Sequence, residues 1–199
     1  MRLALAGLLL AAAALAHAAP PVAFVADIRG NATIEGNGKL NFLAELEPGT
    51  RLLLGSGATA SITYAATGAE FSIAGPGEFS VSPAEVKADK GKPARKRMVG
   101  SPPDPAIVSQ VSRSATASLR MRSLAPASAA ASPDARLENL PADARARAEK
   151  SRAAARTFTD RVNHAMLLQQ LGAAHEARQA WADLARERPD LPELAALAR

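Results

Sequence analysis

Apolar and polar residues alternate along the chain between residues 22 and 88. Ile62 and Tyr64 fall on one side of an extended chain, and so do Phe71 and Ile73. Side chains at every second position of a β-strand share one face of the sheet. This alternation therefore predicts short strands, each with one buried face and one face of small or polar residues.

Glycine-containing turns separate these alternating stretches at intervals of roughly 7 to 12 residues, a spacing that suits a small sandwich or roll. One turn sequence is Asn37-Gly38, and both residues tolerate the positive φ angles of a two-residue hairpin turn. We expect residues 19–88 to form an all-β domain of short antiparallel strands.

The last part of the chain, residues 141–199, has the composition of helices. It is rich in Ala, Arg, Leu and Gln, which are strong helix formers, and Pro141 suits a first helical turn. The pattern predicts a long helix from Pro141, a helical hairpin from Phe158 to Leu191 that turns at Gly172, and a short helix over 192–198. The predicted fold is thus α+β in two parts.

The segment between these parts differs from both in charge. Residues 89–133 contain eight basic and two acidic residues and are rich in Pro, Ser and Ala. Such a composition buries too little apolar area to offset the entropy lost on ordering. We therefore predict that residues 89–140 are mainly a basic linker, in which residues 117–124 could add an edge strand or a helical turn.

The first residues predict export. Arg2 precedes an apolar run from Leu3 to Leu15, and Ala16-His17-Ala18 is a small-x-small cleavage site, so residues 1–18 have the pattern of a signal peptide cleaved after Ala18. The run is shorter than the ~20 residues that span a bilayer, although a retained membrane anchor is the alternative. We expect a periplasmic protein. The absence of Cys excludes disulfides, thiolate metal sites, a cysteine nucleophile and a lipoprotein anchor.

The β part also resembles a known family. The stretch "LEPGTRLLLGSGATASITYAATGAEFSIAGPGEFSV" is similar to the FecR-like periplasmic domain, with a match over about residues 22–88. The resemblance implies an all-β envelope domain used for sensing, binding or assembly. Regulators of sigma factors in that family place an inhibitory segment ahead of a membrane helix. Only Met1 and Arg2 precede the apolar run here, so an anti-sigma role is not expected. The turn and apolar positions that carry the resemblance are Gly49, Leu52, Gly55, Ala58, Ile62, Tyr64, Gly68, Phe71 and Ile73.

The helical hairpin resembles one tetratricopeptide-like repeat. Steps of 5, 4, 3 and 5 residues lead from Gly172 to Pro189 through small, aromatic and apolar positions. A single hairpin leaves apolar faces uncovered. We expect it to dock on the helix from Pro141, on a second copy of the chain or on a partner protein, with Trp181 as the anchor. The residues predicted to pack the hairpin or to contact a partner are Leu168, Gly172, Ala177, Trp181 and Leu184.

No catalytic constellation stands out. His164 and His175 are separated by the turn at Gly172, so they cannot be two ligands on one helix. Glu45 and Glu47 share a strand face and could form a carboxylate pair, but acids beside a turn more often protect a sheet edge. Serine-nucleophile motifs, phosphate loops and metal-ligand spacings are absent. We expect no catalytic residue, metal or cofactor, and therefore no enzyme.

The basic run "KADKGKPARKR" carries the remaining candidate chemistry. It either contacts an anionic polymer or serves as a flexible, soluble linker. Nucleic acid is not expected, because no aromatic residues are interleaved with the bases for stacking. The candidate contacts with a polyanion are Lys87, Lys90, Lys92, Arg95, Lys96 and Arg97.

Together these patterns predict a noncatalytic, exported envelope protein that acts as a binding or assembly module. Its ligand would be an envelope protein or an anionic cell-surface polymer, and the helical region could also self-associate. The alternative is a periplasmic sensor that relays a signal to a membrane partner.

Overall fold

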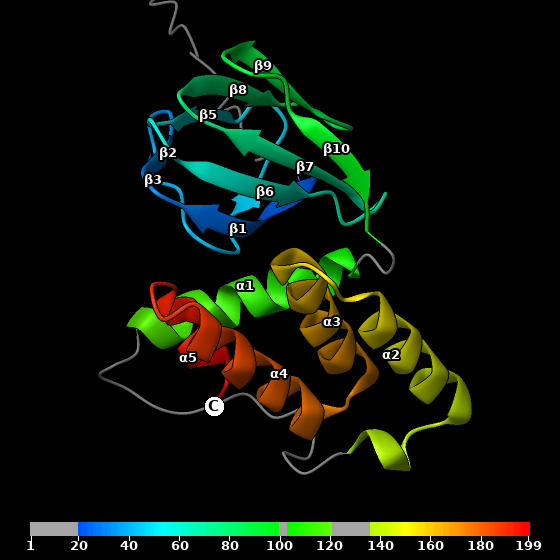
Figure 1. Cartoon of the computed structure of the whole chain (residues 1–199). Coiled ribbons are helices and arrows are strands. Elements are labelled where there is room, and N and C mark those ends of the chain that lie inside the picture. Colours follow the sequence, from blue (N-terminus) through cyan, green and yellow to red (C-terminus); the bar gives the residue numbers. More distant parts are fainter. Residues whose placement is uncertain (1–19, 100–102, 121–135) are drawn as a thin grey trace, which may run out of the picture.

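The computed structural model describes residues 20–99, 103–120 and 136–199 (Figure 1). The predicted signal peptide, residues 1–18, lies outside the described residues. Within the described ranges, no helix combines the length and the hydropathy that a membrane span requires.

Ten antiparallel strands form two five-stranded sheets (Figure 1). The strand order is β10-β7-β6-β1-β4 in one, which we call the β1 sheet, and β3-β2-β5-β8-β9 in the other, the β5 sheet. Together with the helices they make a mixed α+β fold, as predicted. The strands are β1 (Ala23–Arg29), β2 (Ala32–Ile34), β3 (Gly38–Lys39), β4 (Glu45–Leu46), β5 (Arg51–Leu54), β6 (Thr59–Thr63), β7 (Ala69–Ala74), β8 (Gly77–Val81), β9 (Val86–Lys90) and β10 (Arg95–Met98).

The predicted alternation of buried and exposed positions is confirmed on β5, over most of β6 and on β8. On β5, for example, Leu52 and Leu54 are buried, whereas Arg51 and Leu53 are exposed. β1 is different, because its residues from Ala23 to Ala26 are all buried. The β1 sheet lies between the β5 sheet and the helices, so both of its faces are covered (Figure 1).

The first hairpin turn differs from its prediction. Ile34 pairs with Gly38, and the three residues between them form the loop, in which the Asn37 N–H donates to the Ile34 carbonyl at 3.0 Å. Gly38 is therefore the first residue of β3, and the predicted two-residue turn at Asn37-Gly38 was wrong. The positive φ of 75° at Gly36 supplies the left-handed residue inside the loop.

The helices follow the strands in the chain. α3 and α4 lie where two helices were predicted, and Gly172 joins them in the left-handed conformation with φ 81°. The predicted long helix from Pro141 is α2. It ends at Ala154, and residues 155–157 connect it to α3. The helices are α1 (Pro105–Arg120), α2 (Ala142–Ala154), α3 (Phe158–Leu171), α4 (Ala174–Glu187) and α5 (Pro192–Leu197), with a 3₁₀ turn, η1 (Leu137–Asn139).

Part of the segment predicted as a linker forms regular structure instead. β10 adds to the β1 sheet by pairing with β7, and α1 packs against α5 and α3. On α1, Val108, Val111 and Ala115 are buried at helical spacing, and the Ser112 hydroxyl donates to the Leu43 carbonyl at 2.9 Å. The linker interpretation was wrong for these residues, because composition alone does not reveal an apolar stripe of three small side chains.

The helices and the sheets share one apolar core. Phe24 and Phe42 of the β part belong to the same buried cluster as Val162, Trp181 and other helical residues. Trp181 is fully buried, and its Nε1–H donates to Gln169 Oε1 at 3.1 Å. The docking surface that the hairpin needs is therefore supplied by the same chain, and Trp181 is not exposed to a partner.

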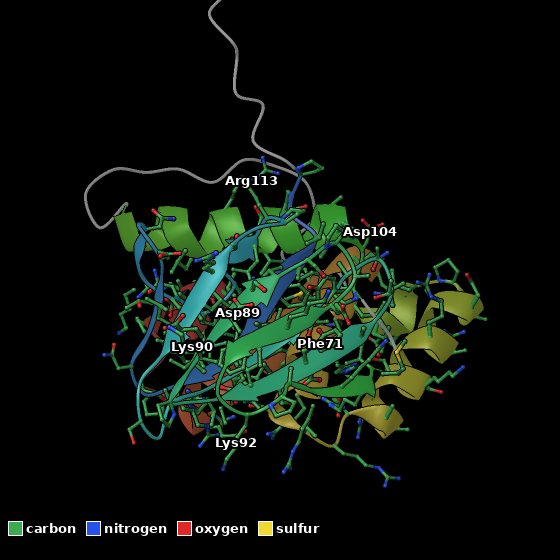
Figure 2. The ribbon with its side chains drawn as sticks, turned by 90° about the horizontal axis from the view of Figure 1, so that it is seen from above. Phe71, Asp89, Lys90, Lys92, Asp104 and Arg113 are labelled. Atoms are coloured by element: carbon green, nitrogen blue, oxygen red, sulfur yellow. The ribbon has the colours of Figure 1, made fainter. Side chains whose placement is uncertain are left out.

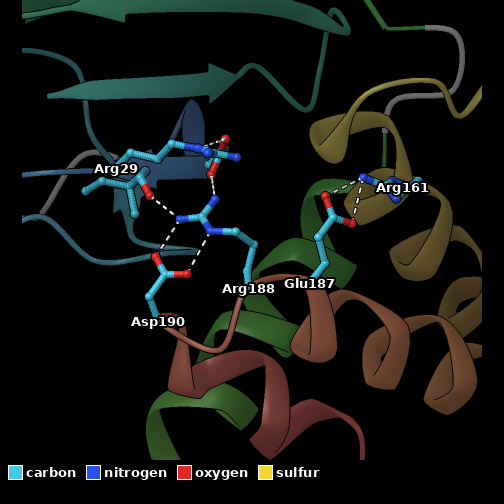
Figure 3. A network of polar contacts seen from close by, with 7 residues as sticks. Arg29, Arg161, Glu187, Arg188 and Asp190 are labelled. Atoms are coloured by element: carbon cyan, nitrogen blue, oxygen red, sulfur yellow. Dashed lines mark hydrogen bonds and ion pairs between the residues drawn. The ribbon is translucent and has the colours of Figure 1, made fainter. Parts of the chain in front are cut away.

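Two arginines tie the helical layer to the β1 sheet. Arg188, which follows α4, pairs with Asp27 of β1 and donates to the Ile28 carbonyl at 2.6 Å (Figure 3). Arg97 of β10 pairs with Glu70 in the sheet and, at 2.8 Å, with Asp160 of α3. Because these ties join residues far apart in sequence, they fix how the two layers sit against each other.

Candidate functional site

An open-sided groove lies between α2 and α4, with α3 as its floor. Its volume is about 430 Å³, which is within the range of small ligand sites. Apolar side chains from the walls and from Leu168 line part of the groove, and polar or charged groups lie on its floor and rims. The lining side chains used in the argument below are Ala148, Glu149 and Arg152 from α2, His164 and Leu168 from α3, and Gln179, Ala180, Asp183 and Leu184 from α4.

The helices that form the groove have well-defined ends. α3 begins with a capping box in which Thr157 and Asp160 exchange hydrogen bonds between side chain and backbone, at 3.2 and 3.0 Å. Hydrogen bonds from Thr157 and the guanidinium of Arg97 outweigh the burial of Asp160, so the pKa of this carboxyl is lowered. The helix ends that position the groove are therefore stabilised by charge as well as by packing.

Polar contacts also close the two ends of the groove. The Leu137 N–H donates to Glu176 Oε2 at 3.0 Å, which ties η1 to the first turn of α4. At the other end Arg161 of α3 pairs with Glu187 of α4 at 2.8 Å (Figure 3). The α4 wall is thus held to its neighbours at both ends, and the middle of the groove remains open.

The middle of the groove carries its polar groups. Burial, together with the positive charge of Arg152, lowers the pKa of the half-buried His164, so its ring is neutral at neutral pH. Glu149 on α2 and Asp183 on α4 place carboxylates on opposite walls, and Asp183 also pairs with Arg186. The groove therefore offers apolar lining, a neutral imidazole, a guanidinium and two carboxylates, a set suited to binding a peptide-like ligand.

The groove contains no recognisable catalytic arrangement among its described residues. Ser151 Oγ lies 3.2 Å from His164 Nδ1, but Ser151 is only 4% exposed and packs between α2 and α3. Over residues 20–99, 103–120 and 136–199, no three His, Asp or Glu side chains cluster closely enough to hold a metal ion. Glu45 and Glu47, the carboxylate pair considered from the sequence, are both exposed.

The structure divides the six basic residues of the predicted polyanion site into two groups. Lys87 pairs with Glu85 at 3.2 Å and Lys90 with Glu78 at 2.9 Å, and Arg97 is the tie to Glu70 and Asp160. Burial raises the pKa of Glu70 even though the Arg97 charge opposes the shift. The other three cations have no carboxylate partner in the described parts of the chain. They are Lys92, Arg95 and Lys96, of which Figure 2 labels Lys92.

The residues predicted to pack the hairpin or to contact a partner are mainly buried inside the protein. Leu168 and Ala177 form a small cluster with Ala148 of α2, and Leu184 is buried with Trp181 in the main core. The α2 wall of the groove was not predicted. Its only sequence signal is the spacing of Ala144, Ala148 and Ser151, which places small side chains on one face.

Comparison of the chain with family models, with curated proteins and with solved structures finds no match.

Proposed function

We propose that this protein is a noncatalytic binding module of the bacterial envelope, and that its groove between α2 and α4 takes a short segment of a partner protein. The observation that carries the proposal is the pairing of apolar lining with two charged rim groups, Glu149 and Arg152, that the rest of the described chain does not use. Glu149 and Arg152 have no ion-pair partner among the described residues.

The chemistry of the groove favours a peptide over a lipid or a sugar. An apolar side chain of the ligand would cover the half-exposed apolar lining at Leu137, Ala155 and Ala180, at ~25 cal/mol per Å² of apolar surface. Backbone amides and charged side chains of the ligand would pair with the carboxylates on the two walls and with Arg152. The α4 wall is already fixed at both ends, so ordering it costs little entropy on binding.

The envelope location rests on the signal-peptide pattern of residues 1–18 and on the resemblance of residues 22–88 to FecR-like periplasmic domains. A sensor that relays a signal to a membrane partner is the alternative function. The two functions differ in how binding responds to a stimulus. A module that assembles envelope components binds its partner constitutively, whereas a sensor changes its affinity with its stimulus.

The experiment places a photo-crosslinking amino acid at position 179, an exposed groove position on α4, in the full chain expressed in its native cells. The control carries the same group at position 113, on the exposed side of α1. We expect a discrete protein adduct from position 179 and none from position 113. Equal adducts from both positions, or adducts without protein, would overturn the proposal.

A matched pair of variants connects the adduct with the groove. Ala180→Trp fills the groove, and Ala154→Trp adds the same side chain at an exposed position of α2 outside it. We expect Ala180→Trp to remove the position-179 adduct and Ala154→Trp to leave it, with similar melting temperatures. An adduct whose yield depends on a stimulus and whose partner is a membrane protein would favour the sensor.

A further inference from the structure

A second surface, independent of the groove, lies along the free edge of β10. Lys92 is in the turn between β9 and β10, and Arg95, Lys96 and Met98 follow on β10 itself. We call these four residues the β10 ridge. Figure 2 shows the sheets from above, with Lys92 at the side of the molecule and Phe71 on the neighbouring strand.

The ridge is exposed because β10 is the last strand of its sheet. β10 pairs with β7 alone, so its outer edge has no neighbouring strand. Met98 is 62% exposed, and the only other large apolar side chain among the described residues that is largely exposed is Leu53, at 39%. An exposed Met next to three cations is not required by the fold.

The two faces of β10 make different contacts. Arg97 faces the helical layer, where it pairs with Glu70 and Asp160. Lys96 and Met98 alternate with it and so share the opposite face, where Lys96 Nζ lies 5.8 Å from the centre of the Phe71 ring. Arg95 lies on the same face as Arg97, so the cations of the ridge flank the free edge of β10 from both sides. The strand is thus anchored through one face while the other presents a charge and an apolar side chain together.

The positive charge of the ridge is not neutralised locally. Glu70 on the paired strand and Asp160 are engaged by Arg97, Glu85 pairs with Lys87, Glu78 pairs with Lys90, and Asp89 accepts a hydrogen bond from Ser80. Since no acid pairs with Lys92, Arg95 or Lys96 in the described ranges, these three cations are available to an external anion.

We infer that the β10 ridge docks on an anionic lipid surface. Three free cations would attract phosphate headgroups, and each basic residue near such a surface strengthens binding about fivefold. Met98 decides between a lipid and a soluble anionic polymer, because an apolar side chain gains free energy in the acyl boundary and gains nothing from a hydrated polymer. The resulting attachment is peripheral and reversible.

The experiment is co-sedimentation of the purified full chain with vesicles of phosphatidylcholine, with or without phosphatidylglycerol. We expect binding only to the vesicles that contain phosphatidylglycerol, with a steep decrease as salt is raised, because exposed charges are screened within ~8 Å at physiological ionic strength. Absence of binding to these vesicles at low salt would overturn the inference.

Three variants locate the contact. Substituting Ser for Lys92, Arg95 and Lys96 together should lower the partition coefficient by about a hundredfold, the product of three fivefold factors. The control removes the same net charge elsewhere, by Ser at Arg113, Arg145 and Arg147, three exposed positions of α1 and α2. Equal losses in both triple variants would mean that net charge, and not the ridge, drives binding.

The third variant, Met98→Ser, should weaken vesicle binding by about tenfold and leave binding to soluble polyphosphate unchanged. No effect of Met98→Ser on vesicles, together with release of the protein by polyphosphate, would identify a polymer ligand and refute the lipid inference. All substituted side chains are exposed, so the melting temperatures should agree. Ala180→Trp should not change vesicle binding, which separates this surface from the groove.

Discussion

Replacement of Arg188 by Ala tests how the helical layer is held to the β1 sheet. The Arg188 side chain is 6% exposed and has three partners. It pairs with Asp27, donates to the Ile28 carbonyl at 2.6 Å, and donates twice to Asp190 at 2.8 Å (Figure 3). Its guanidinium carbon also lies 5.2 Å from the centre of the Phe158 ring.

The expected loss of stability follows from which partners are buried. Removing one member of a buried ion pair costs about 3–5 kcal/mol, because the remaining charge is left without compensation. The Asp27 side chain is 18% exposed, and Arg29 Nε lies 3.7 Å from it, so part of its charge stays compensated. Asp190 is 60% exposed and contributes little. We therefore expect a loss of about 3 kcal/mol, or roughly 6–12 °C in melting temperature.

The assay is equilibrium unfolding in urea, read as a change in midpoint at constant slope. The matched control is Arg186→Ala, two positions earlier, where the arginine is 79% exposed and its partner Asp183 is 68% exposed. The control should lose at most about 0.5 kcal/mol. If Arg188→Ala is no less stable than Arg186→Ala, the reasoning that the layers are held by this buried pair is refuted.

Three other predictions concern single positions in the helices. Gly172→Ala should cost about 1 kcal/mol, seen as a lower melting temperature, because φ is 81° and no neighbouring atom within 4 Å would meet the added Cβ, so only backbone strain opposes it; an unchanged melting temperature would contradict this. Asp160→Asn should destabilise fully at neutral pH and progressively less as the pH falls through the lowered pKa of Asp160, because protonation removes the same charge; a penalty independent of pH in acid urea titrations would be the contrary result. His164→Gln should reduce the loss of stability on acidification below pH ~6.5, since the lowered pKa of His164 makes protonation oppose folding; parallel stability curves for both proteins would exclude that role.

The strands of the β part could be predicted because their signals are local. Alternation at Ile62 and Tyr64 or at Phe71 and Ile73 depends only on neighbouring residues and on the turns that separate them. The helical turn at Gly172 is a local signal as well. One-residue errors, such as the placement of the first hairpin turn, arise where two glycines lie close together and either can take the positive φ.

β10 could not be predicted because its stability depends on distant partners. The sequence Arg95–Met98 looks like part of a solvated linker, but Glu70 and Asp160 offset the charge of Arg97, and Asp160 is 63 residues away. The groove was missed for a similar reason. Its walls come from two helices that only the tertiary packing on α3 brings to face each other, and α2 alone carries too few apolar residues to suggest a binding wall.

The packing of α1 against α5 has a consequence for the order of folding. α1 follows the last strand, whereas α5 is the last helix in the described chain, so the face of α1 that packs on α5 stays uncovered until the helices between them have been made and positioned. Closing so long a loop is entropically costly and slows folding. The sandwich can form early from its hairpins, but α1 can complete its packing only after α5 has formed.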